Sequence, residues 1–548
     1  MRTIETLSMK ISARITLVYP SDGLVYKYDR ARTKRMPVGL GYIAAATIAA
    51  GHKVKIIDAS LYDLTIDETV KQILDNNPDI VGIGCTTPLY HQAVQIIHEV
   101  KKRAPNIVVV MGGPHVSALP DATLKTSEAD FVCIGEGEES FVNIIDAVVN
   151  NKDPQDINGI VYDWNHHIGQ GKEYRLRIHQ DKATTAKAID LNQVPIPARH
   201  VFKYKEYVDY ARDYNETQTQ AMFSRGCPGK CSFCGAADTL VRFRDLDNIL
   251  QEMNEISQLG IKNVAITDDT YTSSKKRVLL LSRGITELNL DLNISVQLRL
   301  DQIDEEICDA MYESGVSHVG PGIESGNDII IAQIGKGRRE SKENMRKAVR
   351  LLQNYDWKIR NSYIMGMPEE TEDQVFETIM FAKELGADEN AFSIVVPYPD
   401  SPLWDVAKSR LAVHDEMDFS KFLYYHEIGC NLSSITTTRL LALHEFAYEY
   451  VGNPAYSLND DSVSSGHRPH IPYLKSDTYK KHREESKMRL DAILLKDTKK
   501  LNGNGIKDNV KENHEFSKIK IEFENFYNNF SNELKYTHDS MDSKGILI

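Results

Sequence analysis

The chain has 548 residues, 41% of them hydrophobic and 26% charged, with a formal net charge of −13. A chain of this length needs two or three domains, because a single hydrophobic core stops growing at about 250–300 residues. The acidic balance argues against a nucleic-acid partner, which would need a basic surface, and no apolar run is long enough to predict a membrane span.

Residues 1–165 alternate short β-branched runs with helical patterns, which predicts an α/β domain with a doubly wound, Rossmann-like parallel sheet. We expect five strands, at residues 13–20, 52–60, 79–87, 106–115 and 130–138. Glycine-rich turns follow the last three of these strands. The carboxyl ends of parallel strands form the edge at which open α/β sheets bind ligands, so we expect the ligand of this domain there.

The rest of the chain predicts a second α/β series and a helical end. Residues 166–216 are polar and punctuated by prolines, as in a linker. Residues 217–430 carry further strand patterns, beginning near residue 221 and continuing at 263–267, 293–298, 317–321, 359–364 and 390–396. With right-handed crossovers, these strands close most of a barrel, a partial (β/α)6 fold. Residues 431–548 predict a mainly helical region with a mobile polar tail, and helices are expected at 436–452 and 516–534.

Three cysteines stand together in the stretch SRGCPGKCSFCGAAD, namely Cys227, Cys231 and Cys234. Soft thiolates this close together indicate zinc or an iron–sulfur cluster. A structural zinc needs a fourth ligand, and a remote one stays open, whereas three thiolates would leave one iron of a [4Fe–4S] cluster free. The other cysteines are isolated, at Cys85, Cys133, Cys308 and Cys430. This cysteine usage, with no apolar segment of the signal-peptide type, predicts a cytoplasmic protein.

The spacing CxxxCxxC, with Phe233 before the last cysteine, resembles the radical S-adenosylmethionine (radical SAM) superfamily. The segments AITDDTYT, GIESGND and YIMGMPEETEDQVFETI extend the resemblance over residues 217–405. It implies that the three cysteines ligate a [4Fe–4S] cluster whose open iron binds SAM. It also implies a set of SAM-binding residues, Phe233, Asp268, Asp269, Arg299, Glu324 and Ser325. Simpler interpretations stay open, because the two aspartates could cap a helix and Arg299 could form a structural ion pair.

The glycine-rich turns of the first domain, in VGIGCTT, MGGPHVSALP and CIGEGEES, resemble the cobalamin-binding domain that often precedes a radical SAM barrel. The resemblance implies a set of cobalamin-binding residues, Thr86, Thr87, Gly112, Gly113, His115, Gly135, Glu136 and Gly137. The glycines would let the backbone approach the macrocycle or its nucleotide tail closely. Because the Asp-x-His-x-x-Gly pattern is absent, His115 is the obvious substitute for the axial histidine, although a hydrogen-bonding role in its turn is simpler. A different ligand, or none, stays open.

Other ligands of doubly wound sheets fit this domain less well. The first strand is not followed by the GxGxxG of a nicotinamide site, and no GxxxxGK[ST] phosphate loop occurs. Methylthiotransferases of transfer RNA carry three further cysteines in their first domain, where this chain has only Cys85 and Cys133.

Together the two resemblances imply a cobalamin-dependent radical SAM enzyme. A donor such as flavodoxin or ferredoxin would reduce the cluster, SAM would yield a 5′-deoxyadenosyl radical, and methylcobalamin would methylate an unactivated carbon, or phosphorus, of a small molecule or lipid. Two alternatives stay open, a radical rearrangement or cyclisation without methyl transfer and a cobalamin-binding sensor with a silent barrel. Tyr363 and Tyr398 could face the substrate, although packing is the more ordinary role of such tyrosines.

Overall fold

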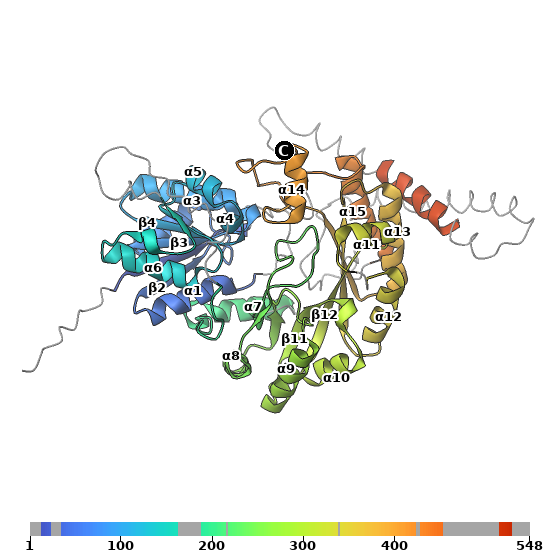
Figure 1. Ribbon diagram of the computed structural model, residues 1–548, viewed down its shortest axis with the longest axis horizontal. Coiled ribbons are helices and arrows are strands. Elements are labelled where there is room, and N and C mark those ends of the chain that lie inside the picture. Colours follow the sequence, from blue (N-terminus) through green and yellow to red (C-terminus); the bar gives the residue numbers. More distant parts are fainter. Residues whose placement is uncertain are drawn as a thin grey trace, which may run out of the picture.

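The computed structural model shows two α/β units and a helical region packed on the second of them (Figure 1). It describes residues 12–22, 34–162, 188–214, 218–337, 340–423, 428–452 and 514–528. The first unit is coloured blue to cyan and the second green to yellow in Figure 1, where they lie side by side. Within the described residues, no helix combines the length and the apolar character needed to cross a membrane.

The first unit contains a six-stranded sheet in the order β2-β1-β3-β4-β5-β6. Its parallel strands confirm the five predicted ones, β1 (Arg14–Tyr19), β2 (Lys53–Asp58), β3 (Ile80–Gly84), β4 (Val108–Gly112) and β5 (Phe131–Cys133). The sixth strand, β6 (Ile160–Tyr162), is antiparallel, and it is too short to leave a periodic signal in the sequence. The strand order reverses between β1 and β3, the point at which doubly wound sheets bind ligands.

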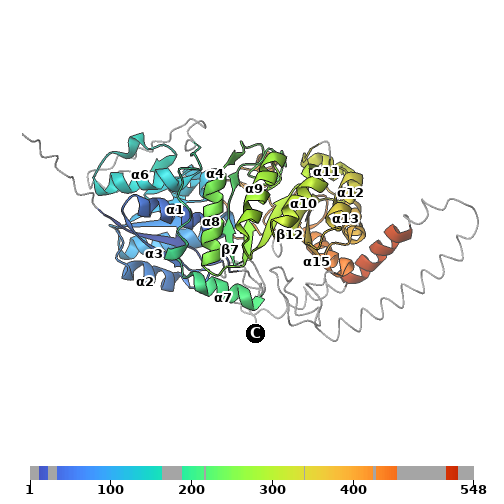
Figure 2. The same cartoon turned by 90° about the horizontal axis from the view of Figure 1, so that it is seen from below.

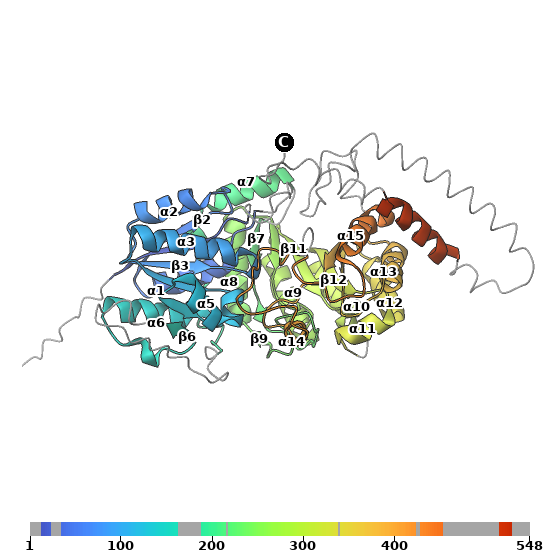
Figure 3. The ribbon, with the colours of Figure 1, turned by 90° about the horizontal axis from the view of Figure 1, so that it is seen from above.

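Helices cover both faces of this sheet, as the alternation of strands and helices predicts. Alternate residues of each strand enter two separate apolar cores, which explains why the central strands β3, β4 and β5 are apolar throughout. One core is closed by α1 (Val38–Ala49) and α6 (Gly137–Val149), and the other by α2 (Ile66–Asp75), α3 (Tyr90–Arg103) and α5 (Pro120–Ser127). Figure 3 shows α2 and α3 on one side of the sheet and α6 on the other.

The second unit contains a six-stranded parallel sheet in the order β14-β13-β12-β11-β10-β7. The strands are β7 (Thr219–Ala221), β10 (Asn263–Ile266), β11 (Asn293–Leu298), β12 (Val316–Glu324), β13 (Lys358–Met365) and β14 (Glu389–Ile394). Because β7 and β14 lie at opposite edges of this order, the sheet forms an open, partial barrel, which confirms the predicted fold.

The helices of the second unit pack on the outer face of its sheet around one large apolar core. They are α8 (Leu246–Gln258), α9 (Lys275–Leu288), α10 (Glu305–Glu313), α11 (Asp328–Ile334), α12 (Lys342–Leu352) and α13 (Glu372–Leu385). Figure 2 shows α8, α9, α10, α12 and α13 following one another along the unit.

The helical end of the chain closes one edge of the barrel. α15 (Thr437–Val451) lies against the edge strand β14, where the Tyr448 hydroxyl accepts a hydrogen bond from the backbone N–H of Phe392 at 3.0 Å. The helix expected at 516–534 is present over the described residues 514–528, and its Phe523 packs on α13 and α15. Covering an edge strand in this way protects its unpaired backbone groups.

The predicted linker is partly helical, because α7 (Tyr204–Tyr214) lies within it. The Tyr207 hydroxyl of α7 donates a hydrogen bond to the buried carboxylate of Asp58 at the end of β2. α7 therefore attaches the first unit to the start of the barrel. The interpretation of residues 166–216 as a plain linker missed this helix, although Tyr204, Tyr207, Val208 and Ala211 follow the i, i+3, i+4, i+7 spacing of a helical face.

Candidate active site

The three clustered cysteines lie in one loop, residues 226–241, which we call the cluster loop. It is held between two short antiparallel strands, β8 (Ser224–Arg225) and β9 (Arg242–Phe243), which form its stem. Two contacts between Cys227 and Thr239 brace its interior. The Cys227 N–H donates to the Thr239 hydroxyl at 2.9 Å, and the Thr239 N–H donates to the Cys227 carbonyl at 2.9 Å.

The end of α11 supports the other side of the cluster loop at close range. The Ser232 N–H donates to the Ile334 carbonyl at 2.9 Å. A Cβ atom at Gly229 would lie 2.9 Å from Nη1 of Arg299 and 3.2 Å from Sγ of Cys227. The Arg299 guanidinium therefore lies directly beside the backbone that carries the thiols.

These residues fit an iron–sulfur cluster. All three thiols are half-buried, whereas Cys85, Cys133, Cys308 and Cys430 are buried elsewhere. Burial, and after it the Glu324 carboxylate, raises the pKa of Cys231 to about 11, while the cations Lys336 and Arg299 oppose the shift and so favour the thiolate that binds iron. In the part of the chain that the structure describes, no three histidine, cysteine or acidic side chains converge as a single metal ion requires. A cubane cluster does not require this, since each thiolate binds a different iron.

Asp268 holds the start of the cluster loop instead of facing a ligand. One carboxylate oxygen accepts the backbone N–H groups of Phe223 at 2.6 Å and Ser224 at 3.0 Å, and the other accepts the Ser224 hydroxyl at 2.6 Å. Burial raises the pKa of Asp268 to about 6. Asp269 is exposed and accepts the Gly226 N–H at 2.8 Å. Neither aspartate caps a helix, because the cap of α9 is Ser274.

Glu324 lies at the carboxyl end of β12 with a left-handed backbone, φ +69°. An acidic residue in this conformation at a strand end is a local strain of the kind found at functional sites. Its carboxylate lies 3.2 Å from the ammonium group of Lys336 and raises the pKa of Cys231 and Cys234, so it lies on the cluster side of the sheet.

The polar groups of Arg299 and Ser325 interact with other side chains of the protein. Arg299 pairs with both oxygens of Asp301, at 3.0 and 3.1 Å, so the structural ion pair is the arrangement present. The Ser325 side chain is buried and lies 3.0 Å from the Thr378 hydroxyl. Phe233 is half-buried in the apolar cluster described below.

Two charged residues beside the cluster loop do not belong to the predicted set. Lys336 is buried and donates to the backbone carbonyl of Gly322, and Glu340 is buried with its carboxylate 3.6 Å from Arg299 and 3.7 Å from Lys336. The sequence could have pointed to both residues, because they lie in the charged stretch IGKGRRE that directly follows an apolar helix.

The predicted cobalamin-binding residues gather at the ligand edge of the first sheet. Gly113 has φ +109° and a Cβ atom there would lie 2.4 Å from the Cys85 carbonyl oxygen, so only glycine fits. Thr86 is exposed at this edge, and Gly135 has φ +76°. Gly112, next to Gly113, is half-buried, and Gly137 begins α6.

His115 is buried in α4 (Pro114–Ala118), with 1% of its surface exposed. Its Nδ1 lies 3.2 Å from the hydroxyl of Thr87, and its ring packs against Tyr90 and Phe419. Burial lowers the pKa of His115 to about 4. This arrangement is the hydrogen-bonding role that the sequence analysis gave as the simpler one, and the ring is not open to the ligand edge.

Glu136 is also turned away from the expected ligand. Its carboxylate accepts hydrogen bonds from Arg225 and Arg242, which form the stem of the cluster loop. The two tyrosines considered as substrate contacts have packing roles. Tyr363 is buried and stacks on Phe392 at 4.9 Å, and the Tyr398 hydroxyl donates to a backbone carbonyl at 2.8 Å.

One apolar cluster joins the ligand edge to the cluster loop. It contains Leu119 of the first unit, Ile334 of α11 and Trp404 of α14 (Pro402–Ser409), and Cys231 and Phe233 pack against it. In Figure 1, α14 lies on the side of the first unit that carries α4. The predicted cobalamin edge and the three cysteines, about a hundred residues apart along the chain, therefore share one environment.

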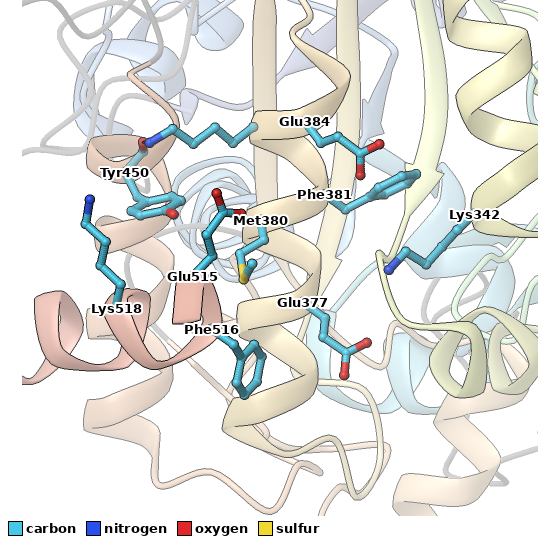
Figure 4. A pocket seen from close by; sticks show the side chains of 10 residues that line it. Lys342, Glu377, Met380, Phe381, Glu384, Tyr450, Glu515, Phe516 and Lys518 are labelled. Carbon is cyan, nitrogen blue, oxygen red and sulfur yellow. The ribbon is translucent and has the colours of Figure 1, made fainter. Parts of the chain in front are cut away.

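A cavity of about 1040 Å³ lies elsewhere, between α13, α15 and the helix at 514–528 (Figure 4). Its walls carry lysine and glutamate side chains around Phe381, Phe516 and Tyr450. None of the predicted site residues lines it, so it is separate from the candidate active site.

Comparisons with known proteins agree with this geometry. A B12-binding domain matches residues 30–145, and the radical SAM superfamily matches residues 222–382. An uncharacterized methyltransferase of Pyrococcus horikoshii is 30% identical over 404 residues, which cover 73% of this chain and 84% of that protein. The cytidylyl-2-hydroxyethylphosphonate methyltransferase of Streptomyces wedmorensis is 26% identical over 439 residues, 71% of this chain and 80% of that protein.

The fold is shared with a solved structure. The radical SAM methyltransferase TsrM from Kitasatospora setae, with cobalamin and a [4Fe–4S] cluster bound, superimposes with a TM-score of 0.61. The match covers 81% of this chain and 91% of TsrM at 18% sequence identity, so it shows a common fold.

Proposed function

Because the chain belongs to the radical SAM enzymes that carry an N-terminal B12-binding domain, we propose that it transfers a methyl group from SAM to an unactivated carbon or phosphorus atom of a small polar molecule. The predicted cofactors are those of this family, cobalamin, SAM and a [4Fe–4S] cluster. When bound, the cluster supplies the electron for homolytic cleavage of SAM and cobalamin carries the methyl group, with a flavodoxin or ferredoxin as the electron source.

The observation that carries the proposal is the packing of the cluster loop against the cobalamin edge. Cys231 and Phe233 contact the same apolar cluster as Leu119, which follows α4 at that edge. Radical and methyl donor must reach one substrate atom, and apolar walls exclude water and stray hydrogen donors from the space between them. The three cysteines would hold the cluster at one side of this space.

Within the predicted SAM-binding set, we assign contact with the cofactor to Phe233, Asp269 and Glu324. Asp268 and Ser325 have their polar atoms engaged in hydrogen bonds within the protein. They position the cluster loop and the end of β12. Thr86, Gly112, Gly113, Gly135 and Gly137 remain the residues that would border cobalamin.

The open face of the barrel sheet supports a polar substrate. On β7, β10 and β11, buried residues alternate with residues that retain exposure. Apart from Ala265 and Gly322, every such residue in the six described strands is polar, including Ser295, Gln297 and Ser362. These side chains offer hydrogen bonds to a polar substrate, whereas an acyl chain buried against them would leave their polar groups without partners.

The test is an anaerobic assay on the reconstituted full chain, with a reductant, cobalamin and SAM labelled in its methyl group. Polar and lipid fractions of a cell extract are supplied in separate reactions. We expect label in a polar product, together with S-adenosylhomocysteine and 5′-deoxyadenosine, and no cleavage by the Cys231→Ala variant. Label in the lipid fraction would contradict the substrate class. Formation of 5′-deoxyadenosine without S-adenosylhomocysteine would instead support a radical rearrangement or cyclisation.

A further inference from the structure

The stem of the cluster loop places two like charges opposite each other. In the pairing of β8 with β9, Arg225 lies directly across from Arg242, and Ser224 lies across from Phe243. Two cations at directly opposed positions of an antiparallel pair repel each other. A stem of two residue pairs has few backbone hydrogen bonds of its own to offset this repulsion, so a counter-charge is needed.

The counter-charge comes from the first unit. Oε1 of Glu136 lies 2.8 Å from Nη1 of Arg225 and 2.6 Å from Nη2 of Arg242, and Oε2 lies 3.1 Å from Nη1 of Arg242. Oε2 also accepts the Ile189 N–H at 2.9 Å. Glu138, two residues on, pairs with the second Nη of Arg225 at 2.5 Å.

This group of charges is largely enclosed. The exposed fractions of the Glu136, Arg225 and Arg242 side chains are 17%, 16% and 24%. Burial by itself would raise the pKa of Glu136, but the hydrogen bonds from Arg242 and Arg225 lower it to about 2. Charge-assisted hydrogen bonds in such a setting are stronger than neutral ones, and an enclosed cation without its partner is costly.

We propose that Glu136 is a positioning residue for the iron–sulfur site, because it joins the two arginines that close the stem of the cluster loop. The cobalamin-binding unit, and not the barrel, thus supplies the charge that fixes the loop carrying the three cysteines. Gly135 and Gly137, on either side of Glu136, belong to the predicted cobalamin edge. One short segment therefore contacts the cluster loop through its side chain and borders the cobalamin site through its backbone.

Further polar contacts hold the units together outside the cluster loop and its stem. Nη1 of Arg244 lies 3.3 Å from the Tyr42 hydroxyl, and the Tyr207 hydroxyl donates to Asp58 at the end of β2. Loss of Glu136 alone should therefore leave the two units attached. Its effect should appear in the stability of the cluster and not in separation of the units.

The test is the rate at which an iron(II) chelator removes iron from the anaerobically reconstituted full chain. Glu136→Gln keeps the shape and removes the charge, and we expect iron release about tenfold faster, the factor that corresponds to ~1.4 kcal/mol. Glu139→Gln, an exposed glutamate on the same helix, is the matched control and should release iron at the native rate. Equal release by Glu136→Gln and the native chain would overturn the proposal.

A double variant distinguishes relief of the repulsion between Arg225 and Arg242 from a general loss of stability. Arg242→Met removes one of the opposed cations, so Glu136→Gln/Arg242→Met should release iron more slowly than Glu136→Gln alone. Additive losses in the double variant would contradict the proposed bridge. The proposal depends on binding of the cluster and not on methyl transfer. If the methylation assay fails but Glu136→Gln still releases iron faster than the native chain, the proposal stands.

Discussion

A single methyl group added at Gly113 should destabilise the first unit, whereas the same group added at Gly112 should not. At Gly113, φ is +109°, and a Cβ atom would lie 2.4 Å from the carbonyl oxygen and 3.0 Å from the nitrogen of Cys85. At Gly112, the nearest atom to a Cβ would be that of Cys133 at 3.8 Å, an ordinary contact. The two positions are neighbours at the same strand end, so they form a matched pair.

The magnitude follows from two costs at Gly113. An alanine at such a positive φ costs about 1–3 kcal/mol. The overlap adds about 1–3 kcal/mol, because the obstructing atoms belong to the backbone of β3's end and cannot rotate away. A loss of about 3 kcal/mol lowers the melting temperature of a unit of this size by about 6–12 °C.

The assay is thermal unfolding of the full chain without cobalamin, followed by calorimetry so that separate transitions are resolved. We expect the transition of the first unit to fall in Gly113→Ala and to stay within about 2 °C of native in Gly112→Ala. Equal shifts in the two variants, or an unchanged transition in Gly113→Ala, would refute the argument. Either result would mean that the chain at Cys85 can move to admit a side chain.

Three further outcomes are expected. Cys231→Ala should lose iron, whereas Cys308→Ala, a change within the helix-packed core, should lower the melting temperature and keep the iron content of the reconstituted protein. Asp268→Ala leaves three donors without their acceptor and should cost about 2–4 kcal/mol in thermal unfolding, most of which Asp268→Asn should restore. Burial raises the pKa of Glu370 from 4.5 to about 7, so the folded protein holds this proton more tightly than the unfolded chain. Stability should therefore fall as the pH rises through that window, and Glu370→Gln should flatten this part of the pH profile.

The sequence alone was sufficient for both α/β units, for the barrel strands and for the cysteine triplet. These features depend on residues close together in the chain, such as β-branched runs, glycine turns and the spacing of Cys227, Cys231 and Cys234. Gly113 was predicted only as a residue that lets the backbone approach cobalamin, and its positive φ and the close Cys85 carbonyl came from the structure. The short strand β6 was missed because three residues leave no periodic pattern, and the helix α7 was missed because it lies in a polar, proline-punctuated segment interpreted as a linker.

Only the tertiary structure decided what the polar residues of the site do. The sequence made Asp268, Arg299 and Ser325 candidates for binding SAM. In the structure, each of these side chains already hydrogen-bonds to another residue of the protein. Glu136 was assigned to cobalamin, yet it pairs with Arg225, 89 positions away. A carboxylate binds whichever cation the fold brings within about 3 Å of it, and that distance depends on how the two units pack, which no local pattern records.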